Sequence, residues 1–542
     1  MNKNKKKFVV VILVLINFFV NGQNHKKINN NEEIYTNPII NSDYSDPDVI
    51  RVRDKYYMTA SSFNCIPGLP ILESIDLVHW KLIGYGLTKQ PPFEVYDMPQ
   101  HGNGVWAPCI RYHNNEFYIY YPDPNFGIYM IKSKNAQGPW SNPILVKSGK
   151  GLIDPTPLWD DNGKTYLVYA FAGSRAGIKS MLVVCSMDSK GILANNDEVL
   201  LIDGHQDEIT IEGPKIYKKN GYYYIFAPAG GVATGWQTVL RSKNIFGPYE
   251  KRKVLEQGKS NINGPHQGAW VTTQTGEDWF FHFQDKGAFG RVVHLQPMKW
   301  KNGWPIIGID VDGNGIGEPV SSFKKPNIGK KIPIKSLRTS DEFNDPQLGL
   351  QWQWHANPKL YWGFPTNLGY FMLNCIPKPK EFINLWDIPN LLLQKFPADE
   401  FTATTKLTFN SHFDDEEFNF VIMGIDYSGL RVKQVEGKIV LSQIICQNAD
   451  KKSIENDIAS TILENNLVYL QVKVIQGGIC TFLYSEDGAN YKNIGITFTA
   501  REGKWIGAKL GYVALRNGFI NDAGNIKIDW IRFSNTENDG IK

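Results

Sequence analysis

The chain has 542 residues, more than one hydrophobic core usually serves, so its length predicts several domains. Hydrophobic residues make up 42% and charged residues 21%, a composition typical of folded globular proteins. The formal charge is +4, but four lysines lie among the first seven residues and no acid lies in residues 1–22. The rest of the chain is therefore balanced in charge, which argues against a nucleic-acid partner.

The N-terminal segment has the pattern of a secretory signal. Its lysines precede an apolar run from Phe8 to Val20, and small residues, Val20 and Gly22, suit a cleavage site. We therefore predict a signal peptide over 1–22 and an exported protein, periplasmic or extracellular. A membrane anchor is the alternative, but the run is short for a span, and no second long apolar stretch follows it. No membrane span is expected after cleavage.

The six cysteines are widely spaced, and none lies in a CxxC or other metal-binding spacing. We expect most of them to be buried single thiols, without a disulfide framework.

An internal repeat organises the first part of the chain. Five segments share one pattern: a small or acidic start, often with proline, then a strand, a polar turn and an aromatic strand. Successive starts lie roughly 47 to 61 residues apart, which leaves room for two further strands in each unit. The repeat predicts a five-bladed β-propeller over 33–325. A β-sandwich with coincidental repetition is the alternative. The segments begin at Asp46, Trp106, Asp154, Glu212 and Gly268.

A second domain follows a short linker. Residues 326–336 contain Pro326, Gly329 and Pro333, which favour a connecting segment. Beyond it, short strands with alternating hydrophobicity and Gly or Asn turns recur, which predicts an antiparallel β-sandwich over 337–538. The predicted fold class is therefore all-β.

Three acids stand near the same position of their repeats. Asp46, Asp154 and Glu212 open the first strand of units one, three and four, and first strands line the channel of a propeller. Carboxyls that meet in one channel suit glycosidic cleavage, because one must donate a proton and another must activate water. A third carboxylate nearby raises the pKa of the acid. The alternative is that these acids only form turns with the prolines beside them.

The motifs around these acids resemble glycoside hydrolase family 43. They are Asn37-Pro-Ile-Ile, Ser45-Asp46-Pro-Asp-Val-Ile, Gly151-Leu-Ile-Asp154-Pro and Ile211-Glu212-Gly-Pro. The resemblance covers essentially the whole mature chain, including a concanavalin A-like sandwich found in β-xylosidase-like and arabinofuranosidase-like members. It implies inverting hydrolysis, with Asp46 as the base, Glu212 as the acid and Asp154 as the residue that orients Glu212 and raises its pKa. Tyr44-Ser45 stands where many relatives have His-Pro.

The resemblance also implies further site residues. Trp106 and Phe63 would shape the pocket wall, although Trp106 could equally belong to a blade core. Arg291 would bind sugar hydroxyls. His266 would meet a hydrated Ca²⁺ in the channel, held mostly by water, with no cofactor required. The sandwich stretch that begins at Trp505-Ile-Gly-Ala would close one side of the pocket, and Lys509 would lie where many relatives place an aromatic.

These features favour an exo-acting enzyme on an oligo- or polysaccharide. Our first expectation is release of terminal non-reducing α-L-arabinofuranosyl residues from plant hemicellulose or its fragments. An exo-β-xylosidase is the alternative, because the two sugars present similar hydroxyl geometry. A catalytically inactive, carbohydrate-binding propeller also stays open. We expect a monomer.

Overall fold

The computed structural model describes residues 33–329, 337–518 and 521–534. The predicted signal peptide, most of the predicted linker and the last residues of the predicted sandwich lie outside the described residues.

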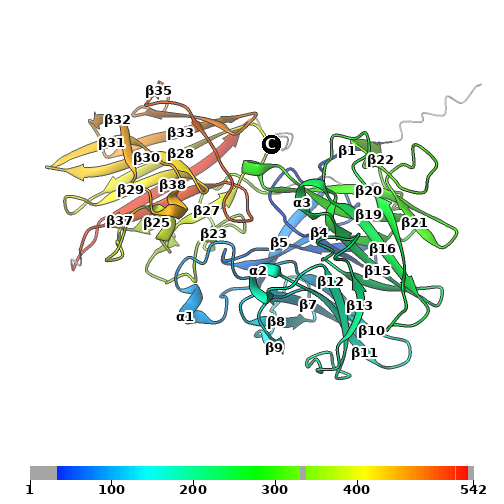
Figure 1. The fold of residues 1–542 in the computed structure, drawn as a ribbon. Coiled ribbons are helices and arrows are strands. Elements are labelled where there is room, and N and C mark those ends of the chain that lie inside the picture. The colour runs from blue at the N-terminus through cyan, green and yellow to red at the C-terminus, as the bar shows by residue number, and fades with distance from the viewer. Residues whose placement is uncertain (1–32, 330–336, 519–520, 535–542) are drawn as a thin grey trace, which may run out of the picture. The chain divides into compact units, whose positions relative to one another are not determined.

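Five four-stranded antiparallel sheets follow one another along the chain, each made of four consecutive strands. Figure 1 shows them in blue to green. The predicted five-bladed propeller is confirmed. Blade one is β2 (Asp48–Val52), β3 (Lys55–Thr59), β4 (Gly68–Ser74) and β5 (Trp80–Leu87), and blade two is β6 (Cys109–His113), β7 (Glu116–Asp123), β8 (Gly127–Ser133) and β9 (Ile144–Ser148). Blade three is β10 (Leu152–Trp159), β11 (Thr165–Phe171), β12 (Met181–Met187) and β13 (Val199–Asp203). Blade four is β14 (Lys215–Lys219), β15 (Tyr222–Ala229), β16 (Trp236–Ser242) and β17 (Glu250–Leu255), and blade five is β18 (His266–Thr272), β19 (Asp278–Asp285), β20 (Arg291–Lys301) and β21 (Trp304–Ile307).

Tight turns join the first two strands of several blades. Asn220 and Gly221 connect β14 to β15 with φ of 51° and 76°, and Asn114 and Asn115 connect β6 to β7 with φ of 47° and 62°. Two successive positive φ angles define the type I′ turn, whose twist matches that of the flanking strands, and Asn and Gly adopt these angles most readily. The polar turns of the repeat are therefore what set the hairpin register.

The N-terminal segment closes the ring of blades. β1 (Ile34–Thr36) pairs with β22 (Ser322–Lys324), and the chain then runs along β20 of blade five. There the N–H of Ile39 donates to Val293 O at 2.9 Å, and the N–H of Tyr44 donates to Arg291 O at 3.0 Å. This path brings the residues that precede blade one beside blade five. Buried apolar clusters fill the space between neighbouring blades.

The second domain is a sandwich of two sheets. One contains β23 (Gln353–Trp354), β26 (Ile376–Pro377), β27 (Leu392–Lys395), β29 (Glu417–Met423), β30 (Tyr427–Val435), β31 (Lys438–Cys446), β32 (Asn456–Leu463) and β37 (Lys509–Arg516). The other contains β24 (Gly363–Pro365), β25 (Phe371–Asn374), β28 (Phe401–Asn410), β33 (Leu467–Ile475), β34 (Ile479–Ser485), β35 (Lys492–Asn493), β36 (Phe498–Thr499) and β38 (Asn525–Ser534).

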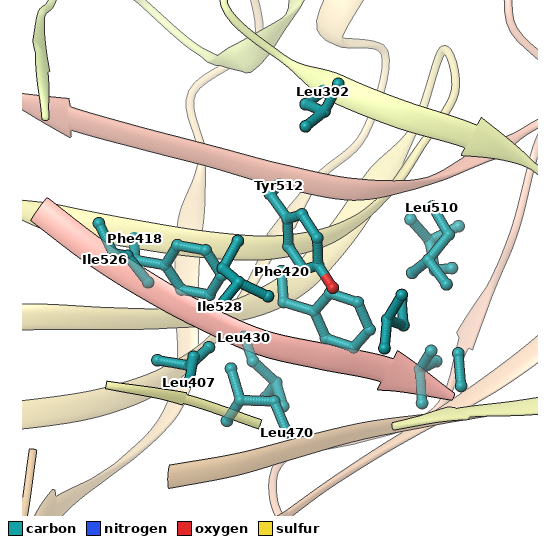
Figure 2. Close-up of a cluster of buried hydrophobic side chains, with 14 of the residues drawn as sticks. Leu392, Leu407, Phe418, Phe420, Leu430, Leu470, Leu510, Tyr512, Ile526 and Ile528 are labelled. Atoms are coloured by element: carbon teal, nitrogen blue, oxygen red, sulfur yellow. The ribbon is translucent and has the colours of Figure 1, made fainter. Parts of the chain in front are cut away.

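Alternation along the strands builds the core of the sandwich. In β28 every second residue is buried, as expected for a strand with one face on a core. Figure 2 shows the result: Leu407 of β28 and Ile528 of β38 lie near Phe420 of β29 and Tyr512 of β37, so side chains from both sheets form one cluster.

Helices are few and short. They are α1 (Phe93–Tyr96), α2 (Gly173–Ala176), α3 (Gly231–Thr234), η1 (Gly287–Phe289), η2 (Leu385–Asp387) and η3 (Ala449–Lys451). Over the described residues, no helix has the length and apolar character needed to cross a bilayer. All six cysteines are buried and unpaired.

The propeller and the sandwich contact each other directly. Ile66 of blade one and Trp354 of β23 exchange two backbone hydrogen bonds, of 2.9 and 2.6 Å. Asn64 Nδ2 donates to His355 O at 2.7 Å, and Lys286 of blade five pairs with Asp399 of the sandwich at 2.8 Å. Loops of the sandwich are thus held near the blade ends that carry the predicted site.

Candidate active site

The first strands of the blades surround a common axis. β2 contacts β18 and β6, β10 contacts β6 and β14, and Trp270 of β18 meets Tyr217 of β14, as the innermost strands of a propeller do. Residues at the beginning of these strands therefore meet at one end of the channel, and this is where the three predicted acids lie.

An unusual backbone conformation aims the acids at the axis. Asp46 and Asp154 both have φ of 56°, and both precede a proline, which disfavours the right-handed helical region for the residue before it. In blade four this position belongs to Gly213, with φ of 60°, and Glu212 comes one residue earlier. In blade three the pairing with β11 shifts around Asp154, a bulge of the kind that redirects side chains at active sites. The acids therefore occupy two adjacent positions of the repeat rather than one.

Hydroxyls and a guanidinium hold the carboxylate of Asp46. Ser61 Oγ donates to Asp46 Oδ2 at 2.5 Å and Ser45 Oγ donates to the same oxygen at 3.1 Å. Arg291 Nη1 lies 3.6 Å from Oδ1 and donates to Ser45 Oγ at 3.0 Å. Arg291 is next to Asp46 because the segment before blade one runs along β20. Oδ2 of Asp46 is thus held by two hydroxyls, while Oδ1 lies beside the guanidinium of Arg291.

Asp154 is buried and linked to the loop that carries Glu212. Its Oδ2 accepts the N–H of Gly213 at 2.7 Å and the Nε2 of Gln267 at 3.2 Å. Burial, with a smaller contribution from the negative charge of Glu212, raises the pKa of Asp154 to about 7, although Lys215 and the Gly213 N–H oppose the rise. Asp154 therefore gains and loses its proton near neutral pH.

Glu212 contacts a histidine. His266 Nε2 lies 2.8 Å from Glu212 Oε1, and the imidazole is buried while Glu212 is partly exposed. His266 Nδ1 is buried without a hydrogen-bond partner among the described residues. Glu212 thus faces the cavity with one carboxyl oxygen tied to a ring nitrogen.

The surroundings of His266 do not fit a calcium ion held by the protein. Calcium takes six to eight oxygen ligands, whereas His266 offers one ring nitrogen, and the neighbouring side chain of Gln267 offers one unpartnered oxygen, Oε1. Among the described residues, no group of three His, Cys, Asp or Glu side chains converges as metal ligands do. We therefore derive no step through a metal.

A cavity of about 580 Å³ opens above the three carboxyls. The structure brings Asp46, Asp154, Glu212, Phe63, Trp106, Arg291 and His266 together in its lining. A volume of this size accommodates a small sugar and part of a leaving group, and the mixture of ring faces with a few charged groups is typical of ligand sites.

One predicted site residue lies elsewhere. Lys509 does not line the cavity: it is buried at the beginning of β37, where its Nζ lies 2.9 Å from Cys65 Sγ and 3.4 Å from Gln353 Oε1. The prediction was wrong because the strand turns this side chain toward the contact between the two domains. Trp505 reaches the cavity instead, from the loop four residues earlier, with φ of 65° and 48% of its surface exposed.

Trp505 completes an aromatic wall. Its ring centroid lies 6.3 Å from that of Trp106, and the guanidinium carbon of Arg291 lies 5.6 Å from its centroid. Trp505 was part of the stretch of the second domain that we predicted to close the pocket, so the sequence did point to this region.

Sequence reasoning missed other residues of the site. Ser61 stands in a Ser-Ser-Phe run, Gln267 follows His266, and Phe171 and Lys179 flank α2 on the cavity rim. Of these residues, only Gln267 could have been found from the repeat, because it occupies the same position as Asp46 and Asp154. Its φ of 44° is positive, as theirs is.

Comparison with known proteins agrees with this geometry. Residues 35–305 match the model of glycosyl hydrolases family 43, and residues 340–534 match that of the beta xylosidase C-terminal concanavalin A-like domain. A putative beta-xylosidase of Xylanibacter ruminicola is 38% identical over 88% of this chain and 85% of its own length. A beta-xylosidase of Formosa agariphila is 32% identical over 92% of this chain and 90% of its own. A non-reducing end alpha-L-arabinofuranosidase of Bacteroides ovatus is 29% identical over 73% of this chain and 74% of its own.

A five-bladed propeller with three carboxyls in an axial cavity, followed by a concanavalin A-like sandwich, defines a two-domain glycosidase. The chain belongs to glycoside hydrolase family 43.

Proposed function

We propose that the chain is an exo-β-xylosidase that removes terminal non-reducing xylosyl residues from xylan-type oligosaccharides. The observation that carries this choice is the similarity, across both domains, to two proteins named as β-xylosidases. These relatives favour a β-xylosidase, which was the alternative prediction from the sequence, over an α-L-arabinofuranosidase, which was the first one.

The geometry supports exo action. The carboxyls line a cavity of about 580 Å³, and Trp505 of the sandwich lies on its wall beside Trp106. An aromatic wall beside the reacting sugar would hinder a chain from continuing past it, so we expect the sugar next to the carboxyls to be a terminal one.

The proposed reaction is a single displacement. Asp46 takes a proton from water as the water oxygen bonds to the anomeric carbon, and Glu212 gives its proton to the leaving oxygen as the glycosidic bond breaks. The sugar leaves with inverted configuration, and solvent returns the two carboxyls to their starting protonation. Asp154 holds the Gly213 N–H, and so fixes the loop that carries Glu212.

The choice of sugar is tested with two aryl glycosides. We expect a higher kcat/KM on nitrophenyl β-D-xylopyranoside than on nitrophenyl α-L-arabinofuranoside. The reverse order would contradict the xylosidase proposal and support the arabinofuranosidase, the activity named for the Bacteroides ovatus relative. No turnover on either sugar, with binding of xylooligosaccharides retained, would indicate a carbohydrate-binding propeller.

A further inference from the structure

An arginine of the neighbouring blade lies against the ring of Trp106. The guanidinium carbon of Arg175 is 5.5 Å from the ring centroid of Trp106. Arg175 belongs to α2, the short helix between β11 and β12 of blade three, whereas Trp106 comes just before β6 of blade two. Trp106 lines the cavity and Arg175 does not. Arg175 therefore contacts this part of the cavity wall from outside the cavity lining.

Three hydrogen bonds fix the orientation of the Arg175 guanidinium. Its Nη2 donates to Asn103 Oδ1 at 2.7 Å, and its Nε donates to Asn125 Oδ1 at 3.1 Å. Its Nη1 donates to Ser174 Oγ at 2.9 Å. Both asparagines lie in loops of blade two, the blade that Trp106 precedes. A guanidinium whose donors are engaged in its plane keeps its flat face free to stack on an aromatic ring, which an ammonium cannot do in the same way.

The turn that carries Arg175 packs directly on the segment that carries Asp154. The N–H of Ala172 donates to Gly151 O at 2.8 Å, three residues before Asp154. Gly151 has φ of 80°, and a methyl group there would lie 2.5 Å from the backbone N of Ala176. Only glycine fits this close approach without strain. The position of Arg175 is therefore set by the same backbone segment that leads to the carboxyls.

The sandwich packs against the loop on the other side of Trp106. The Nε1 of Trp106 donates to Gly102 O at 2.9 Å. A methyl group at Gly102 would lie 2.3 Å from Lys504 Cγ and 3.0 Å from Trp505 Cδ1, so the loop of the sandwich approaches this glycine closely. The Trp505 ring meets that of Trp106 at an angle of 66°. A shift of Trp106 would therefore also disturb Trp505.

We propose that Arg175 is a positioning residue for substrate binding: it holds Trp106 in the orientation that forms the cavity wall with Trp505. The proposal rests on the proposed role of this cavity as the sugar site. Without the guanidinium, the ring of Trp106 gains freedom, and this freedom must be lost again when the sugar binds. Arg175 contacts none of the three carboxyls, so its removal weakens binding and leaves the bond-breaking step nearly unchanged.

The test measures KM and kcat in Arg175→Met and Arg175→Lys, on the nitrophenyl glycoside that the unmodified protein prefers. In Arg175→Met we expect KM to rise about fivefold and kcat to change less than about twofold. Arg175→Lys keeps the charge but loses the flat face and the fork of donors, so its KM stays close to that of Arg175→Met. Arg252→Met is the control: Arg252 lies 4.7 Å from the ring of Trp304, outside the cavity lining, and its loss leaves KM and kcat unchanged.

A double-mutant cycle identifies the ring through which Arg175 acts. In a Trp106→Ala background there is no ring to hold, so Arg175→Met raises KM by less than about twofold. Increases at 106 and 175 that multiply, an unchanged KM in Arg175→Met, or full recovery in Arg175→Lys would overturn the proposal.

Two further measurements keep the outcome clear. If Arg175→Met does not fold, Asn103→Ala removes one hydrogen bond of the guanidinium and raises KM by a smaller factor. Failure of the xylosidase proposal is seen separately, because it changes which aryl glycoside the unmodified protein cleaves. If the protein cleaves neither, the same comparison is made with the Kd for xylooligosaccharides.

Discussion

Asp154 of blade three accepts the N–H of Gly213 of blade four at 2.7 Å, so one carboxyl of the cavity is hydrogen-bonded to the residue that follows another, Glu212. This bond crosses the boundary between two blades. It explains how acids from separate repeats keep a fixed relation without touching through their own side chains. A change in the backbone at Gly213 would therefore also change the hydrogen bonding of the Asp154 carboxyl.

Gly213→Ala should damage both stability and activity. Gly213 has φ of 60°, and a methyl group there would lie 2.5 Å from Gln267 Oε1. The strain and the displacement of Gln267, which donates to Asp154, should lower Tm and reduce kcat/KM by at least tenfold. Gly221→Ala is the matched control, since it has φ of 76° but open space around it. Gly221→Ala should lower Tm alone; equal activity losses in the two variants would contradict this account.

Ser61→Ala should slow turnover without unfolding the protein. Its hydroxyl donates to Asp46 at 2.5 Å, and hydrogen bonds to charged groups contribute about 1.5–3 kcal/mol, so kcat should fall roughly 10- to 100-fold. Ser62 is a neighbouring control. Its Oγ accepts the backbone N–H of Leu69, whereas Ser61 donates to the carboxylate of Asp46. We expect Ser62→Ala to lower Tm more than kcat. Steady-state kinetics and thermal melts on both variants decide the matter.

Trp505→Ala should weaken substrate binding. The ring forms part of the cavity wall beside Trp106 and Arg291, so its removal should raise KM about tenfold, or ~1.4 kcal/mol, with a smaller effect on kcat. Phe413→Ala removes another exposed aromatic of the sandwich, one outside the cavity lining, and should leave KM unchanged. An unaltered KM in Trp505→Ala would remove the sandwich from the substrate site.

The stability of the protein should depend on pH through Asp154. Its pKa is raised to about 7 in the folded state, so the folded protein binds this proton more tightly than the unfolded chain does. Stability from this group is therefore present at low pH and is lost as pH rises from about 4 to about 7. The Tm of the unmodified protein should fall across that range relative to Asp154→Asn. The exposed Asp161→Asn control should follow the unmodified protein, and a constant difference between Asp154→Asn and the unmodified protein would refute the raised pKa.

Much of the architecture follows from local patterns in the sequence. The propeller could be predicted because each unit repeats a strand, an Asn- or Gly-containing turn and an aromatic strand, and such turns fix register without distant contacts. The three acids could be predicted because proline or glycine marks the beginning of each inner strand. The sandwich followed from strict alternation, as in Phe401–Asn410.

The parts that could not be predicted depend on contacts between distant segments. Asp46 meets Arg291 only because the N-terminal segment runs along blade five. Lys509 and Trp505 are four residues apart, and which of them reaches the cavity depends on where β37 begins. The hydrogen bond from Lys215 Nζ of β14 to Pro108 O, just before β6, likewise joins segments far apart in the sequence.

The proposed role of Glu212 as the general acid is tested most directly by the kcat/KM of Glu212→Ala on two substrates that differ in leaving group. A general acid contributes about 10²- to 10⁴-fold, and only when the leaving oxygen needs a proton. The account predicts that kcat/KM on xylobiose falls by about 10³-fold or more, while kcat/KM on dinitrophenyl xyloside falls less than about tenfold. Equal losses on the two substrates, or no loss on either, would contradict it.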